Sequence, residues 1–273
     1  MALYDVGGGG ELRAIERGAG DTILFIHGWP TGAAIWKHQL EALSAEHRVI
    51  AIDLPGFGGS PPIAEPTVSA FAAVVKGFID AAGLSDVFLI GWSMGAGTVM
   101  SYCEQFGAQG LRALGIVDDC PCLLPGEGWE LGVDTTFSPD GVDGWKERWA
   151  DDRRSVITEL SEMELKDPSR HSEELAFMVE ESMQADPDGA LAALMDAFGC
   201  DFRAGLPRIS VPTLLLYGAF SEMTTAANRT YMRDTIPDAT LEVFDESAHT
   251  LMLEEPEKFN RVVDEFARAT RAG

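Results

Sequence analysis

The apolar positions along this chain follow two alternating patterns. Short, mostly apolar runs rich in β-branched residues are typical of strands buried within a sheet. Longer stretches with apolar residues three and four positions apart are typical of amphipathic helices. Strands are expected at 22–26, 49–52, 87–90, 111–117, 211–218 and 240–244, and helices at 34–45, 67–82, 96–107, 225–235 and 256–267.

Strands that alternate with helices at this spacing predict an α/β fold with a mostly parallel, doubly wound sheet. Residues 11–17 alternate apolar and polar positions, as a half-exposed edge strand does. Right-handed crossovers bring the carboxyl ends of the parallel strands to one edge of the sheet. Ligands bind at that edge in open α/β sheets. The residues that follow these strands, and so are expected there, are His27, Asp53, Ser93 and Asp118.

The alternation stops between about residues 122 and 206, where helical patterns follow one another without strands. We therefore expect a core domain formed by 1–121 and 207–273, and an inserted helical cap formed by 122–206. The cap contains many tryptophans and methionines. Most of them are expected to pack in its own core, but Trp145 is a candidate for contact with a substrate.

The bulk composition excludes several classes of protein. With 273 residues and 46% hydrophobic residues the chain can bury a large core. Its formal net charge of −24 repels nucleic acids and anionic membranes. No run approaches the roughly 20 apolar residues of a membrane span, and the first residues do not resemble a signal peptide, so we expect a cytoplasmic protein. The oligomeric state has no signature in the sequence.

The four cysteines lack the spacing of a metal site or a disulfide framework. We interpret them as reduced thiols, mostly buried.

The strand at 87–90 leads into Gly91-Trp92-Ser93-Met94-Gly95, and a helical pattern follows. A serine between a buried strand and a helix occupies a tight turn that exposes its hydroxyl group, and glycines are needed where the strand and the helix come close. The Met94 amide then lies at the helix N-terminus, where unpaired N–H groups favour developing negative charge. This geometry predicts a nucleophile.

Three other motifs accompany this turn: His27-Gly28-Trp29-Pro30, Asp53-Leu-Pro-Gly-Phe-Gly-Gly-Ser60 and Ala248-His249 followed by Glu255-Pro256. In this order and at these separations, the four motifs resemble the α/β-hydrolase family over almost the whole chain. The resemblance implies the α/β-hydrolase fold, with a sheet of up to eight strands and a lid between strands six and seven.

The family pattern implies Ser93 as nucleophile and His249 as the base that accepts its proton. The backbone amides of Trp29 and Met94 would form the oxyanion hole, and the side chains of Trp29 and Trp92 would form pocket walls. Neither a metal nor a cofactor is implied.

The third member of the triad departs from the commoner family pattern. An aspartate is usual a few residues after strand seven, but this chain has Gly218-Ala-Phe-Ser221 there. Some relatives take the acid from the end of strand six instead. Asp118 is therefore our first candidate, Asp119 the second, and Glu222 the third.

A serine nucleophile implies acyl transfer rather than the alkyl-ester chemistry of dehalogenases and epoxide hydrolases, which need an aspartate at that position. The apolar cap and the acidic chain favour a neutral, hydrophobic ester or lactone as the small-molecule substrate. The alternatives left open are a hydrolase-like ligand receptor with little turnover, and a perhydrolase or thioesterase that uses the same triad.

Overall fold

The structure, a computed structural model, describes residues 2–6, 10–132 and 139–271. Its centre is an eight-stranded sheet with the strand order β1-β2-β4-β3-β5-β6-β7-β8. The strands are β1 Ala2–Asp5, β2 Glu11–Arg17, β3 Thr22–Ile26, β4 Arg48–Ile52, β5 Val87–Trp92, β6 Leu111–Val117, β7 Thr213–Gly218 and β8 Ala239–Phe244. From β4 to β8 all neighbours are parallel, and only β2 runs against both of its neighbours. The predicted mostly parallel sheet is confirmed.

Strand β2 corrects one prediction, because it is not at the edge of the sheet. The strand β1, in the glycine-rich start of the chain, pairs with it antiparallel, with Ala2 opposite Ala14. Alternating burial along β2, with Leu12 and Ala14 buried, reflects one covered face. Such a pattern reports which face of a strand is covered and carries no information on whether its outer edge is paired.

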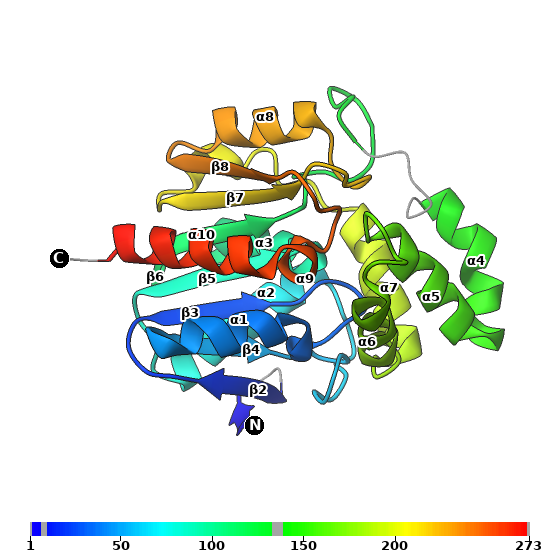
Figure 1. Cartoon of the computed structure of the whole chain (residues 1–273), viewed down its shortest axis with the longest axis horizontal. Helices are drawn as coiled ribbons and strands as arrows, with labels where there is room; N and C mark the ends of the chain where they lie inside the picture. Colours follow the sequence, from blue (N-terminus) through cyan, green and yellow to red (C-terminus); the bar gives the residue numbers. More distant parts are fainter. Residues whose placement is uncertain (1, 7–9, 133–138, 272–273) are drawn as a thin grey trace.

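Helices cover both faces of the sheet, and the sheet separates two apolar clusters (Figure 1). One face carries α2 Val68–Ala81, α3 Met94–Phe106 and α8 Ala226–Thr235, and the other carries α1 Lys37–Ala42, α9 Leu251–Glu254 and α10 Pro256–Ala269. The helix expected at 34–45 is divided, because 3₁₀ turns at Ala33–Trp36 and Leu43–Ala45 flank α1. Such tighter turns are frequent at helix ends.

Among the residues described between β6 and β7, four α-helices lie beyond the carboxyl ends of the strands (Figure 1). They are α4 Pro139–Asp151, α5 Arg153–Met163, α6 Ser172–Ser182 and α7 Pro187–Phe198. The break between α4 and α5 falls at Asp152, whose side chain accepts a hydrogen bond from Ser155 N (3.2 Å) and so begins α5. Asp186 begins α7 in the same way, with 2.7 Å to Gly189 N.

The two segments that join these helices to the sheet lie side by side. Phe202 N donates to Pro121 O over 2.7 Å, and Cys122 pairs with Asp201 in an isolated antiparallel bridge. The helical segment is therefore inserted at one place in the sheet.

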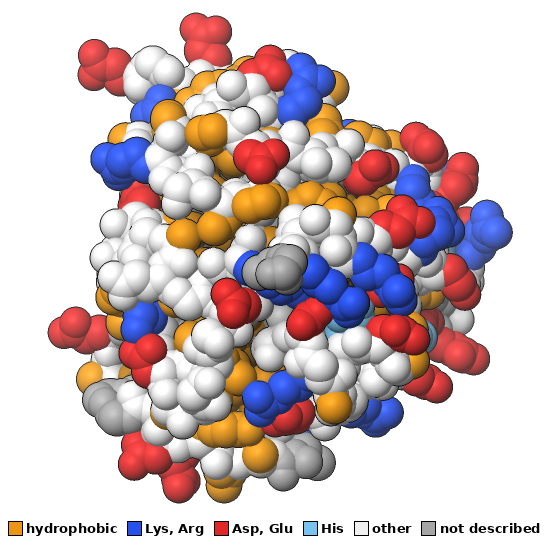
Figure 2. All heavy atoms as spheres, turned by 90° about the vertical axis from the view of Figure 1, so that its left-hand side faces the viewer, with side chains coloured by type: hydrophobic (Ala, Val, Ile, Leu, Met, Phe, Trp, Pro, Cys, Tyr) orange, Lys and Arg blue, Asp and Glu red, His pale blue; other side chains and the backbone are white. Residues whose placement is uncertain are grey.

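Figure 2 shows the face of the molecule opposite these helices. Both acidic and basic side chains are scattered over it, although the chain carries a net charge of −24. In the described part of the chain, no helix is both long and apolar enough to span a bilayer.

Candidate active site

Ser93 occupies the sharp turn between β5 and α3. Its backbone has φ 53° and ψ −123°, a conformation that L side chains rarely adopt. A Cβ atom on Gly91 would lie 2.1 Å from Gly95 O, and one on Gly95 would lie 2.5 Å from the carbonyl oxygens of Ile26 and His27. Both glycines are thus required by the close approach of backbone segments, which hold the serine in this strained conformation.

The two backbone amides predicted as oxyanion donors belong to the start of α3 and to the loop after β3. Met94 is the first residue of α3, so its amide has no acceptor within the helix. Trp29 lies in the loop after β3, which the buried ring of His27 holds in place. Nδ1 of His27 is 2.9 Å from Gly28 O, and Nε2 accepts from Leu54 N over 3.0 Å. Burial lowers the pKa of His27, so the ring stays neutral and can accept this bond.

His249 follows β8 and reaches Asp118 at the end of β6. Its Nδ1 lies 2.6 Å from Asp118 Oδ2, and both side chains are buried. Burial alone would lower the pKa of His249, but the hydrogen bond and charge of Asp118, with smaller contributions from Glu164 and Asp119, raise it above the ordinary value. The Trp92 indole donates to His249 O over 2.9 Å, which fixes the backbone of the histidine from below.

The Asp118 carboxylate accepts two hydrogen bonds from the segment that follows β7. Ser221 Oγ donates to Oδ2 over 2.5 Å, and Thr224 Oγ1 donates to Oδ1 over 3.0 Å. Its backbone is also left-handed, with φ 46°. Ser221 stands where the commoner family pattern has its aspartate, and here it supports the carboxylate that comes from the other strand.

The structure distinguishes the three acidic residues that the sequence offered as the third member of the triad. Asp119, next to Asp118, lines the pocket described below, and its Oδ1 accepts from Cys120 N over 2.9 Å. Burial raises the pKa of Asp119 to about 7. Glu222 is exposed. Only Asp118 among the three is hydrogen-bonded to His249 in the described residues.

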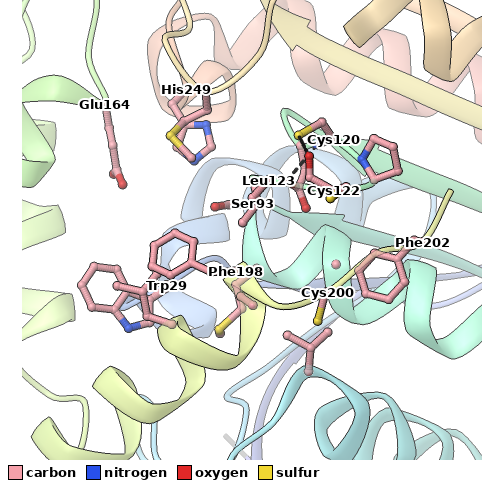
Figure 3. A pocket seen from close by; sticks show the side chains of 18 residues that line it. Trp29, Ser93, Cys120, Cys122, Leu123, Glu164, Phe198, Cys200, Phe202 and His249 are labelled. Atoms are coloured by element: carbon pink, nitrogen blue, oxygen red, sulfur yellow. Dashed lines mark hydrogen bonds between the residues drawn. The ribbon is translucent and has the colours of Figure 1, made fainter. Parts of the chain in front are cut away.

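A pocket joins these groups (Figure 3). Ser93, Met94, Trp29 and His249 line it from the sheet side, and the figure shows the labelled side chains of Ser93 and His249 directed into the same cavity. The inserted helices and the segments joining them contribute further walls, which are mostly apolar. These residues are Cys122, Leu123, Glu164, Leu194, Ala197, Phe198, Cys200 and Phe202.

Two predicted pocket residues lie elsewhere. Trp92 is completely buried beneath His249, and Trp145 packs against Trp149 and Trp29, with ring centroids 5.7 and 6.1 Å apart. Neither is among the residues that line the pocket. Neither the place of Trp92 at the end of β5 nor the helical spacing around Trp145 could show which neighbour each ring contacts.

Sequence reasoning also missed residues that do line the pocket. Glu164 stands between α5 and α6 in no recognisable motif, so nothing in the sequence indicated it. Cys120, Cys122 and Cys200 face the pocket as free thiols. Within residues 2–6, 10–132 and 139–271, no group of three or more histidine, cysteine or acidic residues is arranged to hold a metal ion.

Comparison with known proteins gives consistent matches over nearly the full length. The sequence profile described as the alpha/beta hydrolase family matches residues 23–262. The chain is 26% identical to a pimeloyl-[acyl-carrier protein] methyl ester esterase of Aeromonas hydrophila, over 93% of this chain and 98% of that one. It is 28% identical to the non-heme chloroperoxidase CPO-A1 of Kitasatospora aureofaciens, over 97% and 99%. The solved esterase EaEST of Exiguobacterium antarcticum superposes with a TM-score of 0.90 at 25% identity, over 98% and 100%.

Proposed function

Because this chain belongs to the alpha/beta hydrolase family, we propose that it is a serine hydrolase that cleaves a neutral, hydrophobic carboxylic ester or lactone. Ser93 is the nucleophile, His249 the general base and acid, and Asp118 the carboxylate that orients the imidazole. The amides of Trp29 and Met94 form the oxyanion hole. The observation that carries this proposal is the 2.6 Å contact between His249 Nδ1 and Asp118 Oδ2, behind a pocket that Ser93 shares with the imidazole.

The reaction follows from these positions. His249 removes the proton of the Ser93 hydroxyl as that oxygen attacks the substrate carbonyl, and the two amides stabilise the resulting oxyanion. The imidazolium then gives its proton to the leaving alcohol, and an acyl-enzyme remains. Water, activated by the same ring, repeats the addition and releases the acid. Ser221 and Thr224 donate hydrogen bonds to the Asp118 oxygens and so hold its carboxylate group beside the imidazole.

The substrate class rests on the walls of the pocket. Leu194, Ala197 and Phe198 on α7, with Phe202 beyond it, contribute apolar surface opposite the nucleophile. We infer that 122–206 acts as a cap that encloses the hydrophobic part of a small ester or lactone, while 1–121 and 207–273 supply the chemistry.

A fluorophosphonate probe tests the proposal, because it phosphorylates an activated serine. We expect prompt labelling of the wild-type protein and none of Ser93→Ala, with p-nitrophenyl ester turnover lost in parallel by a factor of about 10³ or more. A protein that folds, binds esters and neither labels nor turns over would be a ligand receptor, and the proposal would be wrong.

A second candidate reaction is supported by the similarity to a non-heme chloroperoxidase. Hydrogen peroxide in place of water would attack the same acyl-enzyme and release a peroxy acid, with no change in the residues that act. Peracid formation from an ester in the presence of hydrogen peroxide, absent in Ser93→Ala, would identify this activity. If peroxide does not alter the product, only hydrolysis remains.

A further inference from the structure

Glu164 is the acidic residue that the cap contributes to the pocket, and the proposed reaction assigns it no role. It lies between α5 and α6, with 7% of its surface exposed. In the described part of the chain, no group donates a hydrogen bond to its carboxylate, and Figure 3 shows that carboxylate directed into the pocket. The carboxyl group of Glu164 is therefore free to accept a hydrogen bond from a ligand in the pocket.

The position of Glu164 is fixed relative to the base of the triad. Its carbonyl oxygen accepts hydrogen bonds from His249 N (3.0 Å) and Thr250 N (3.3 Å), and from Thr250 Oγ1 (3.2 Å). The residue is therefore held by its backbone while its side chain remains available. A substrate whose carbonyl carbon meets Ser93 would present another of its groups to this carboxyl group.

The residues around Glu164 determine which charge is favourable on the substrate group that it contacts. Asp119, 8% exposed, is the other carboxylic acid in the pocket wall. Burial raises the pKa of Glu164 to about 7, and the charge of Asp118 contributes to the increase. Among the described residues that line the pocket there is no lysine or arginine. A carboxylate brought into this space would meet two acids and no permanent cation, so it would be repelled.

We propose that Glu164 is a specificity-determining residue, and that the substrate is an ester or lactone carrying a hydrogen-bond-donating hydroxyl or ammonium group and no carboxylate. This inference rests on the proposed function, which supplies the ester, and it adds the second recognition point. The apolar walls hold the hydrocarbon part, and Glu164 receives the donor at a fixed distance from Ser93.

Matched esters test this inference. We would use methyl esters of straight-chain acids of equal length that end in a methyl, hydroxyl, ammonium or carboxylate group, and acetates of alcohols that end in the same four groups. In one of the two series, kcat/KM for the hydroxyl and ammonium esters is expected to exceed that for the carboxylate ester by about 100-fold or more. A hydrogen bond to a charged group contributes about 1.5–3 kcal/mol, so Glu164→Gln should reduce the ammonium-to-methyl ratio by about tenfold or more.

Glu162→Gln is the matched control, because it removes the same charge from an exposed position on the same segment. Equal changes in Glu162→Gln and Glu164→Gln would show that overall charge selects the substrate, and would overturn the inference. Failure of the wild-type enzyme to discriminate among the four end groups in both series would overturn it too.

Binding to Ser93→Ala separates this inference from the proposed function. Calorimetry with the same uncleaved esters should give tighter binding of the ammonium ester than of the carboxylate ester, and Glu164→Gln in that background should remove the preference. This result without turnover in the wild-type enzyme would contradict the proposed function alone. Indiscriminate binding despite normal turnover would contradict the role of Glu164 alone.

Discussion

The sheet and the cap differ in how many hydrogen bonds their buried acidic side chains accept from the protein. On the sheet side, Asp118 is held by donors from Ser221, Thr224 and His249. Asp53 accepts from Ala33 N and Gly59 N over 2.6 and 2.9 Å. On the cap side, no described residue donates to the carboxylate of Glu164. An acid whose bonds are all made within the protein can orient other groups, whereas an unpaired one is available to a ligand.

The same division separates the elements that carry the groups. Ser93 and Asp118 directly follow fully or almost fully buried strands, so backbone hydrogen bonds on both sides fix where their side chains start. The cap contributes side chains from helices that pack on α2, α3 and the turn at Ala33–Trp36. We therefore expect substitutions on the sheet side to change the rate of the chemistry, and substitutions in the cap to change stability or substrate choice.

The largest effect is expected from Asp118→Asn. The amide cannot support the imidazolium and favours the wrong tautomer of His249, so kcat should fall by about 10⁴. Steady-state turnover of p-nitrophenyl esters measures this loss. Asp119→Asn and Glu222→Gln serve as controls, and each should retain most of kcat. If kcat fell most in Glu222→Gln or Asp119→Asn instead, that residue and not Asp118 would be the acid of the triad.

Trp145→Ala tests whether the aromatic cluster of the cap is structural. Trp145 is 5% exposed and packs against Trp149 and Trp29 outside the pocket. Truncation of a buried tryptophan costs about 3–5 kcal/mol, which urea unfolding would register as a lower midpoint. Phe198→Ala, at the pocket wall, should instead alter the preference between short and long esters. A Trp145 variant that kept its stability and changed its preference would reverse this distinction.

Ser221→Ala should have a smaller effect on the rate. It removes one of the hydrogen bonds to the Asp118 carboxylate, worth about 1.5–3 kcal/mol for a charged acceptor, so kcat should fall by roughly 10- to 100-fold if the loss appears in the transition state. Ser221→Thr retains the hydroxyl group and is expected to recover most of the rate. Equal loss in both variants would indicate that the loop after β7, rather than the hydroxyl group, supports Asp118.

The smallest effect concerns pH. The reaction needs neutral His249, whose pKa is raised by Asp118 and, less strongly, by Glu164 despite the opposing effect of burial. The wild-type kcat/KM should therefore fall as pH decreases through a value above about 6.5. Glu164→Gln removes one of the raising charges, so the midpoint of this fall should move to lower pH. A profile with an unchanged midpoint would mean that Glu164 does not influence the ring.

Most of the fold could be predicted because apolar runs and helical periodicity report burial directly. The strand β1 was missed, since it is short and largely exposed and lies beside glycines that weaken any strand pattern. In the candidate site, the turn at Ser93 is encoded locally by Gly91 and Gly95, whose hydrogen atoms leave room for neighbouring carbonyl groups. The Asp118–His249 contact joins residues 131 positions apart, and only the order of the strands brings them together.

The pocket walls could not be predicted in the same way. Spacing along a helix indicates which residues share a face, but it does not indicate which face of the cap is turned toward Ser93. Trp145 and Glu164 illustrate the two errors that follow: the large aromatic residue packs away from the pocket, and the charged residue, which is ordinarily expected in solvent, is enclosed in it.

The paired segments at Pro121–Cys122 and Asp201–Phe202 have a consequence for how such a protein can diversify. Because the insertion leaves and returns at almost one point, another insertion with the same end-to-end spacing could replace it without disturbing the register of the sheet. Recombination or laboratory grafting at this junction would replace the whole inserted segment, and with it the pocket walls that contact the substrate. The reacting groups would be inherited unchanged.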